Sequence, residues 1–160
     1  MFEAISAKVL EHFRNPRNVG VLEDANGHGR VENPVCGDIT DMYLKIVDGR
    51  IVDVKFTSLG CFATIASASA LTEVVKGKTL KELLNFEEGA EALIERFMEM
   101  IRHELGNLPK AKWHCPPASI ESFLRALIEY FKNIGGEEDV VRNLEEAIKV
   151  LKPYYGMGSK

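Results

Sequence analysis

The sequence predicts an α+β fold in which a small three-stranded antiparallel sheet is covered by about five to six helices. Two apolar alternations flank an Asp48-Gly49 turn, which is typical of a β-hairpin. Beyond residue 61, apolar residues recur at three- and four-residue spacings, as they do in amphipathic helices. Because a sheet with one apolar face needs a cover, the helices are expected to pack on it.

Composition is that of an ordinary globular chain. Its 160 residues are 46% hydrophobic and 28% charged, which predicts a single domain over residues 1–160 with a flexible tail at 152–160. The net charge of −4 gives no reason to expect a nucleic-acid partner. The first 20 residues are amphipathic and interrupted by charge, unlike a signal peptide or a membrane span. We therefore expect a cytoplasmic protein without a membrane partner.

The N-terminal part predicts one helix and three strands. Phe2, Ile5, Val9 and Phe13 share a helical spacing over residues 2–14, and Pro16 ends that helix. A first strand is expected at about residues 29–32. The hairpin follows, with one apolar side formed by Met42, Leu44 and Ile46 on its first strand and by Val52, Val54 and Phe56 on its second.

Helices are predicted for the rest of the chain. The first helix, at about residues 61–76, is rich in small residues, so that another backbone can approach it closely. Gly77 follows as its expected C-cap. Residues 106–113 are expected to be a linker, and residues 153–160 a frayed tail. The expected helices span about residues 61–76, 79–84, 87–105, 116–133 and 137–151.

The three cysteines each stand at the edge of a predicted element. Cys36 precedes the hairpin, Cys61 follows it, and Cys115 opens a helix just before two prolines. An odd number of cysteines without a secretory signal favours a reducing compartment and metal or thiol chemistry. A helix start would lower the thiol pKa of Cys61 and of Cys115, and so favour the metal-binding thiolate.

A fourth ligand is left open by the residues alone. In an extended chain Asp38 would face the same way as Cys36, and His114 adjoins Cys115. Either would complete a tetrahedral site for zinc or an iron–sulfur cluster. The plainer alternatives are that Asp38 only caps backbone amides in a turn and that His114 is an isolated, satisfied histidine. The cysteine spacing matches no compact zinc-finger pattern.

Four motifs in order carry a family resemblance. They are Asn15-Pro16-Arg17-Asn18-Val19-Gly20 after a helix bearing His12, Cys36-Gly37-Asp38, Gly60-Cys61 with Ala66-Ser67-Ala68-Ser69, and Lys112-Trp113-His114-Cys115. Together they resemble the IscU/NifU-N family of iron–sulfur cluster scaffold proteins, with a SufE/NifU-like fold, from near the N-terminus to about Tyr130. The SufU branch is the second choice.

The resemblance implies a scaffold that builds a [2Fe–2S] cluster from iron and from persulfide sulfur delivered by an IscS/NifS-like cysteine desulfurase. The cluster then passes to apo iron–sulfur proteins, so the chain is expected to be a carrier more than an independent catalyst. The family pattern makes Cys115 the persulfide acceptor, associates Asp38 with cluster lability and places Lys112 near the site. The implied ligands are Cys36, Asp38, Cys61, His114 and Cys115, with zinc as an alternative metal in the cluster-free form.

The sequence also departs from the family pattern. The segment expected to bind an Hsp70-type chaperone is degenerate, reading Leu108-Pro109-Lys110-Ala111-Lys112. The longer stretch between Cys61 and Cys115 is similar to SufU, so a zinc-dependent sulfurtransferase is the main alternative, although His114 weighs against it. A cysteine hydrolase and a structural zinc domain are the further alternatives. The oligomeric state, including a homodimer, stays open.

Overall fold

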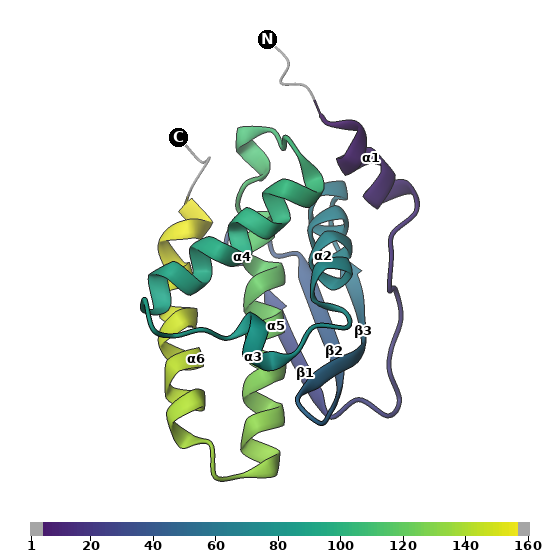
Figure 1. The fold of residues 1–160 in the computed structure, drawn as a ribbon. Coiled ribbons are helices and arrows are strands. Elements are labelled where there is room, and N and C mark those ends of the chain that lie inside the picture. The colour runs from purple at the N-terminus through teal and green to yellow at the C-terminus, as the bar shows by residue number, and fades with distance from the viewer. Residues whose placement is uncertain (1–4, 157–160) are drawn as a thin grey trace.

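The computed structural model describes residues 5–156 and confirms the predicted fold class (Figure 1). Three antiparallel strands lie in the order β1-β2-β3, with helices packed on one face. In chain order the elements are α1 (Ala7–Arg14), β1 (Gly27–Glu32), β2 (Ile39–Val47), β3 (Arg50–Leu59), α2 (Phe62–Val75), α3 (Leu80–Leu83), α4 (Ala90–Leu105), the 3-10 helix η1 (Lys110–Lys112), α5 (Cys115–Ile134), α6 (Glu138–Leu151) and the 3-10 helix η2 (Lys152–Gly156).

The hairpin forms as predicted, except for one register shift. Lys45 pairs with Asp53 but Ile46 pairs with Ile51, which leaves Val52 as a bulge. The prediction that Val52 faces the core was therefore wrong: it is 45% exposed, and Ile51 is buried in its place. Side chains alternate along a strand, so the extra residue turns Ile51 toward the core in place of Val52. Val54 and Phe56 stay on the buried face, as predicted.

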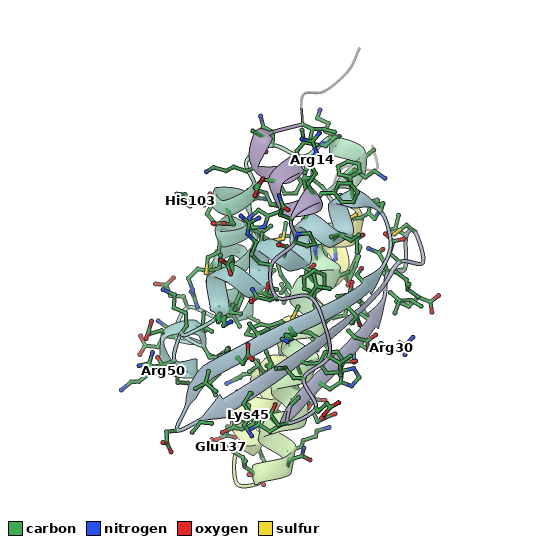
Figure 2. The ribbon with its side chains drawn as sticks, turned by 90° about the vertical axis from the view of Figure 1, so that its right-hand side faces the viewer. Arg14, Arg30, Lys45, Arg50, His103 and Glu137 are labelled. Carbon is green, nitrogen blue, oxygen red and sulfur yellow. The ribbon has the colours of Figure 1, made fainter. Side chains whose placement is uncertain are left out.

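Two helices, α2 and α5, cover the apolar face of the sheet. The small residues of α2 are buried almost all round, as the sequence predicted, because α1, α4, α5 and β3 all pack against this helix. Glycines allow α5 to lie directly on β1: a Cβ at Gly29 would come within 2.1 Å of the Ser122 carbonyl oxygen, and one at Gly27 within 2.5 Å of that of Ala126. The other sheet face carries Arg30 and Lys45, and the segment that links α1 to β1 crosses in front of it (Figure 2).

The N-terminal helix is shorter and more polar in its packing than predicted. It begins at Ala7 with Ser6 as its N-cap, so Ile5 precedes it, and the expected helical position of Phe2 lies outside the described residues. Its buried residues are Val9 and His12, whereas Phe13 is 41% exposed. His12 is held by Ser69, 2.8 Å from its Nδ1, and by Glu104, 3.1 Å from its Nε2. Hydrogen bonds thus replace part of the expected apolar contact.

The C-terminal segment is ordered further than the sequence indicated. Residues 152–156 were expected to fray, but they form η2, and Tyr155 is buried with its hydroxyl donating to Glu121 at 2.8 Å. Tyr154 donates to Glu95 at 2.6 Å. These aromatic anchors dock the segment on α4 and α5, a tertiary contact that no local pattern reveals. Within residues 5–156, no helix is both long and apolar enough to cross a membrane.

Candidate metal centre

Antiparallel pairing brings the cysteine-bearing segments to one end of the sheet. Glu32 pairs with Ile39, and Ile39 pairs with Leu59, so the segment after β1 lies beside the segment after β3. The first of these segments, residues 33–38, is called the Cys36 loop below. The second leads through Gly60 into Cys61, which is the N-cap residue of α2. The same end receives Cys115, the first residue of α5.

Cys61 and Cys115, the thiol pair, lie in direct contact although 54 residues separate them in sequence. Their sulfur atoms are 4.0 Å apart, with Cys115 fully buried and Cys61 half-buried. The hydrogen bond with Cys115, together with the contact to Thr64 and the backbone amides of the helix start, lowers the pKa of Cys61 to about 5. This shift favours the thiolate form of Cys61.

The predicted lowering of the Cys115 pKa was wrong. Although Cys115 opens a helix, its hydrogen bond to the Cys61 sulfur and its complete burial raise its pKa well above the usual range. The two sulfurs share one proton, which stays on the more buried of the two because a buried charge is the costlier one. A helix start favours a thiolate only when solvent or an opposite charge can stabilise it.

Asp38 spans the Cys36 loop and α2. Its Oδ2 accepts hydrogen bonds from the Cys61 amide at 3.1 Å and from the Thr64 hydroxyl at 2.6 Å. Partial burial opposes ionisation, but the hydrogen bonds from Thr64 and Cys61 win and lower the pKa of Asp38. The carboxylate thus caps α2, whose own N-cap residue makes no side-chain cap. The cap matches the alternative in which Asp38 only binds backbone amides. The same hydrogen bonds also hold the Asp38 carboxylate beside Cys61.

Gly60 makes the approach of Asp38 to α2 sterically feasible. A Cβ at position 60 would lie 2.5 Å from Oδ2 of Asp38 and 2.6 Å from its carboxyl carbon. No side chain fits at that distance, so a larger residue would displace the carboxylate from the Cys61 amide. Gly60 therefore allows the Asp38 carboxylate to approach the start of α2.

Cys36 lies on an exposed turn, apart from the thiol pair. The expected extended conformation is wrong here, because residues 34–36 form a turn and Gly37 has a φ of 79°. Cys36 and Asp38 still interact directly, and partial burial and the Asp38 charge raise the pKa of the Cys36 thiol. In residues 5–156, no three His, Cys, Asp or Glu side chains are gathered closely enough to hold a metal ion.

Lys112 and His114 lie in the segment that leads into α5, where His114 is the N-cap residue. Lys112 lies over the ring of Phe62, with its Nζ 5.6 Å from the ring centroid, and so stays near the residue after Cys61. His114 is half-buried, and its backbone carbonyl accepts a hydrogen bond from the Asn33 side chain at 2.9 Å. Lys112 thus lies beside the start of α2, and His114 immediately precedes Cys115 in the chain.

The donor chemistry fits a thiophilic metal. Two sulfurs that each lie about 2.3 Å from one tetrahedral ion are about 3.8 Å apart, close to the 4.0 Å between the thiol pair. Binding would release the proton that Cys61 and Cys115 share. Cys36, which lies on an exposed turn, would supply a third sulfur.

Two residues of the site were not identified from the sequence. Thr64 donates to Asp38, and its hydroxyl lies 3.6 Å from the Cys61 sulfur. Its position three residues after an N-cap was the available signal. Asn33 is buried and bridges the Cys36 loop to His114. An Asn-Pro turn signal marks Asn33, but no local pattern points to its distant partner.

Sequence comparison identifies the family of the chain. Residues 4–136 match the NifU-like N terminal domain family, and the chain belongs to this family. The match ends before α6, so α6 and η2 extend beyond the family domain. Every residue of the candidate site lies within the matched part.

Similar proteins include three named as iron–sulfur cluster assembly scaffold protein IscU. Archaeoglobus fulgidus IscU 1 is 45% identical over 139 residues, covering 87% of this chain and 84% of that protein. The Aquifex aeolicus protein is 42% identical over 149 residues, with coverages of 92% and 84%. The Haemophilus influenzae protein is 40% identical over 131 residues, with coverages of 79% and 95%.

The fold also occurs in a crystal structure from Fervidobacterium islandicum. That protein, FiSufU, is described as a candidate iron–sulfur cluster assembly scaffold for the SUF system. It superposes with a TM-score of 0.58 at 24% identity and covers 76% of this chain and 95% of its own. At this identity the similarity establishes the shared fold.

Proposed function

We propose that this protein is a scaffold on which an iron–sulfur cluster, of the [2Fe–2S] type, is assembled and then passed to apo-proteins. The observation that carries the proposal is the 4.0 Å contact between the thiol pair, with the Asp38 carboxylate bound to the Cys61 amide beside it. The names of the IscU relatives, at 40–45% identity, point in the same direction. The cluster is cargo, so the site must both bind it and release it.

Three thiolates would supply the affinity, from Cys36, Cys61 and Cys115. The fourth ligand would be Asp38 or His114, and either binds a soft metal more weakly than a thiolate does. Asp38 accepts the hydrogen bonds from the Cys61 amide and Thr64 with Oδ2, so Oδ1 would be the oxygen that binds a metal. A carboxylate in the fourth position would be the weakest ligand of the set, which would favour release of the cluster to an acceptor.

Sulfur would arrive as a persulfide from a pyridoxal-phosphate cysteine desulfurase, with Cys115 as the acceptor. A Cys115 thiolate would attack the outer sulfur and release the desulfurase cysteine as a thiolate. Cys115 is protonated and buried at rest, so it must give its proton to Cys61 and become accessible when the desulfurase docks. Reduction of the bound sulfur to sulfide requires an external electron donor.

Anaerobic reconstitution tests the scaffold proposal directly. Purified protein is incubated with ferrous iron, sulfide and a thiol, desalted, and analysed for iron, sulfide and zinc together with its visible spectrum. A coloured protein that retains iron and acid-labile sulfide supports the proposal. A protein that retains neither, even when its three cysteines are reduced, contradicts it.

Zinc is the second candidate, favoured by the spacing of the thiol pair, which suits one tetrahedral ion. It would occupy the cluster-free form or, in a SufU-type sulfurtransferase, would stay bound while a ligand cysteine accepts sulfur. Metal analysis of protein purified without chelator distinguishes these roles. Zinc that iron and sulfide displace belongs to a scaffold, and zinc that persists through sulfur transfer belongs to a sulfurtransferase.

Partners and location follow from the same proposal. The cysteines are unbridged, which suits a reducing compartment such as the cytoplasm. An Hsp70-type chaperone would have to recognise residues 108–112, where Leu108 is buried and Lys110–Lys112 form η1. Chaperone stimulation of cluster transfer, compared with and without ATP, decides whether this segment is recognised.

A further inference from the structure

We propose that Asn33 is a positioning residue, which holds the Cys36 loop at the thiol pair through the hydrogen bond from its side-chain amide to the His114 carbonyl. The inference rests on the proposed function, because it gives Asn33 a role in bringing the third sulfur to the metal. It concerns an amide that binds neither metal nor sulfur itself.

All the polar groups of Asn33 are used. Asn33 is only 2% exposed, its Nδ2 donates to the His114 carbonyl at 2.9 Å, and its Oδ1 accepts from the Val35 amide at 2.9 Å. Its own amide donates to the Asp38 carbonyl, and its carbonyl accepts from Gly37, each at 2.8 Å. The Cys36 loop is therefore closed on Asn33 at its base.

The loop shape does not need the bond to His114. The contact with Val35 and the two backbone bonds already define the turn, as an Asn side chain commonly does. The side-chain amide instead reaches a carbonyl 81 residues away, on the residue that immediately precedes Cys115. Its effect is to fix the turn relative to the start of α5.

Two bonds thus attach the loop base to the helix starts that carry the thiol pair. Asn33 attaches it to the start of α5, and Asp38 attaches it to the Cys61 amide at the start of α2. Between these two points the turn carries Cys36, which is exposed. This restraint raises the effective concentration of the Cys36 sulfur at the thiol pair above that expected for an unrestrained loop.

The test compares Asn33→Ser with Asn26→Ser. A serine at position 33 can still accept from the Val35 amide but is too short to reach His114, and it adds no charge. Asn26 is the matched control, because its side chain also bridges backbone, with Nδ2 2.7 Å from the Ile46 carbonyl and Oδ1 2.8 Å from the Ile46 amide. It lies at the opposite end of the β1–β2 pair from the Cys36 loop.

Two measurements are made on each variant. In the metal-free protein, amide hydrogen exchange of residues 35–38 should rise about fivefold or more in Asn33→Ser, the change expected when a buried hydrogen bond is lost. With Co²⁺ as probe, affinity should fall by about fivefold or more, and the sulfur-to-cobalt absorbance should drop to that of Cys36→Ser. Asn26→Ser should match the wild type in both, even if it melts earlier.

The result that overturns the proposal is an Asn33→Ser protein with the same loop exchange and cobalt spectrum as Asn26→Ser. If Asn33→Ser does not fold, the isosteric Asn33→Asp, which lacks the donor, replaces it under the same criteria. Failure of the scaffold proposal looks different: the wild type would not retain iron and sulfide, while the loop exchange of Asn33→Ser would still rise. If instead the wild type retains the cluster and loop exchange in Asn33→Ser is unchanged, only the role of Asn33 is rejected, and the scaffold proposal stands.

Discussion

The thiol pair stands on the first residues of two buried helices, whereas Cys36 stands on an exposed turn between two strands. Many packing contacts fix α2 and α5, so their sulfurs meet at 4.0 Å before any metal arrives. The Cys36 loop is held by the hydrogen bonds of Asn33 and Asp38, and its cysteine is exposed. In the proposed scaffold, the packed pair would provide the affinity, and the exposed third ligand would be the easier one to exchange. Changes to the two regions should therefore have different consequences.

The largest effect is expected in the rigid pair. Cys115→Ser should reduce persulfide capture from a cysteine desulfurase to background, because the proposed acceptor sulfur is gone. Labelled cysteine and a non-reducing gel measure the capture. Cys36→Ser, on the exposed loop, is the control and should keep persulfide capture. Capture retained by Cys115→Ser would move the acceptor role to another cysteine.

Proton sharing within the pair predicts a specific pH dependence. With a pKa of about 5, Cys61 should be alkylated by iodoacetamide at nearly the same rate from pH 6 to pH 8. Cys115→Ala removes the donor, so the pKa of Cys61 should rise toward about 8.5 and its rate at pH 6 should fall by about a hundredfold. Peptide mass mapping gives the rate at each cysteine. A Cys61 rate in the wild type that climbs tenfold per pH unit would contradict shared protonation.

Asp38 lies between the two regions, and its removal should have an intermediate effect. Asp38→Ala should lengthen the lifetime of a reconstituted cluster several-fold, because the weak ligand is lost. It should also lower the free energy of unfolding by about 1 kcal/mol through the lost cap of α2. Absorbance decay in air and urea titration measure these quantities. An unchanged or shorter cluster lifetime would argue against the lability role.

The sign of the pH effect on stability follows from the lowered pKa of Asp38. A carboxylate with a lowered folded pKa stabilises the protein above its unfolded pKa of about 3.9, and this contribution disappears as the pH falls through the folded value. The stability difference between wild type and Asp38→Ala should therefore be constant at neutral pH and vanish in acid. A difference that grows in acid would show that Asp38 acts through something other than its charge.

The smallest effect is expected at Gly60. Gly60→Ala keeps the Asp38 carboxylate but pushes it away from the Cys61 amide, so cluster lifetime should change in the same direction as in Asp38→Ala and by less. Gly156→Ala, where a Cβ would meet no atom within 4 Å, is the control. In the double variant Gly60→Ala/Asp38→Ala, the glycine substitution should add little, because the clash is with Asp38 itself. Additive effects on lifetime would contradict this coupling.

Most of the fold could be predicted from the sequence because the signals are local. The Asp48-Gly49 turn, the alternation of Met42 and Leu44, and the prolines after Cys115 each act within a few residues, and the structure has the hairpin and α5 where those signals stand. The exceptions arose where a partner overrides the pattern. A bulge turned Val52 outward, and the hydrogen bond of Tyr155 to Glu121 ordered a segment expected to fray.

The candidate site divides in the same way. Sequence alone identified the three cysteines, Asp38, Lys112 and His114, because residue type and motif order are properties of the chain. Only the tertiary structure decided that Cys115 keeps the proton, that Asp38 caps α2 and that Asn33 reaches His114. These outcomes depend on distances of a few ångströms between segments 23 to 81 residues apart. Hydrogen bonding and desolvation change steeply over such distances, and no periodicity along the chain encodes them.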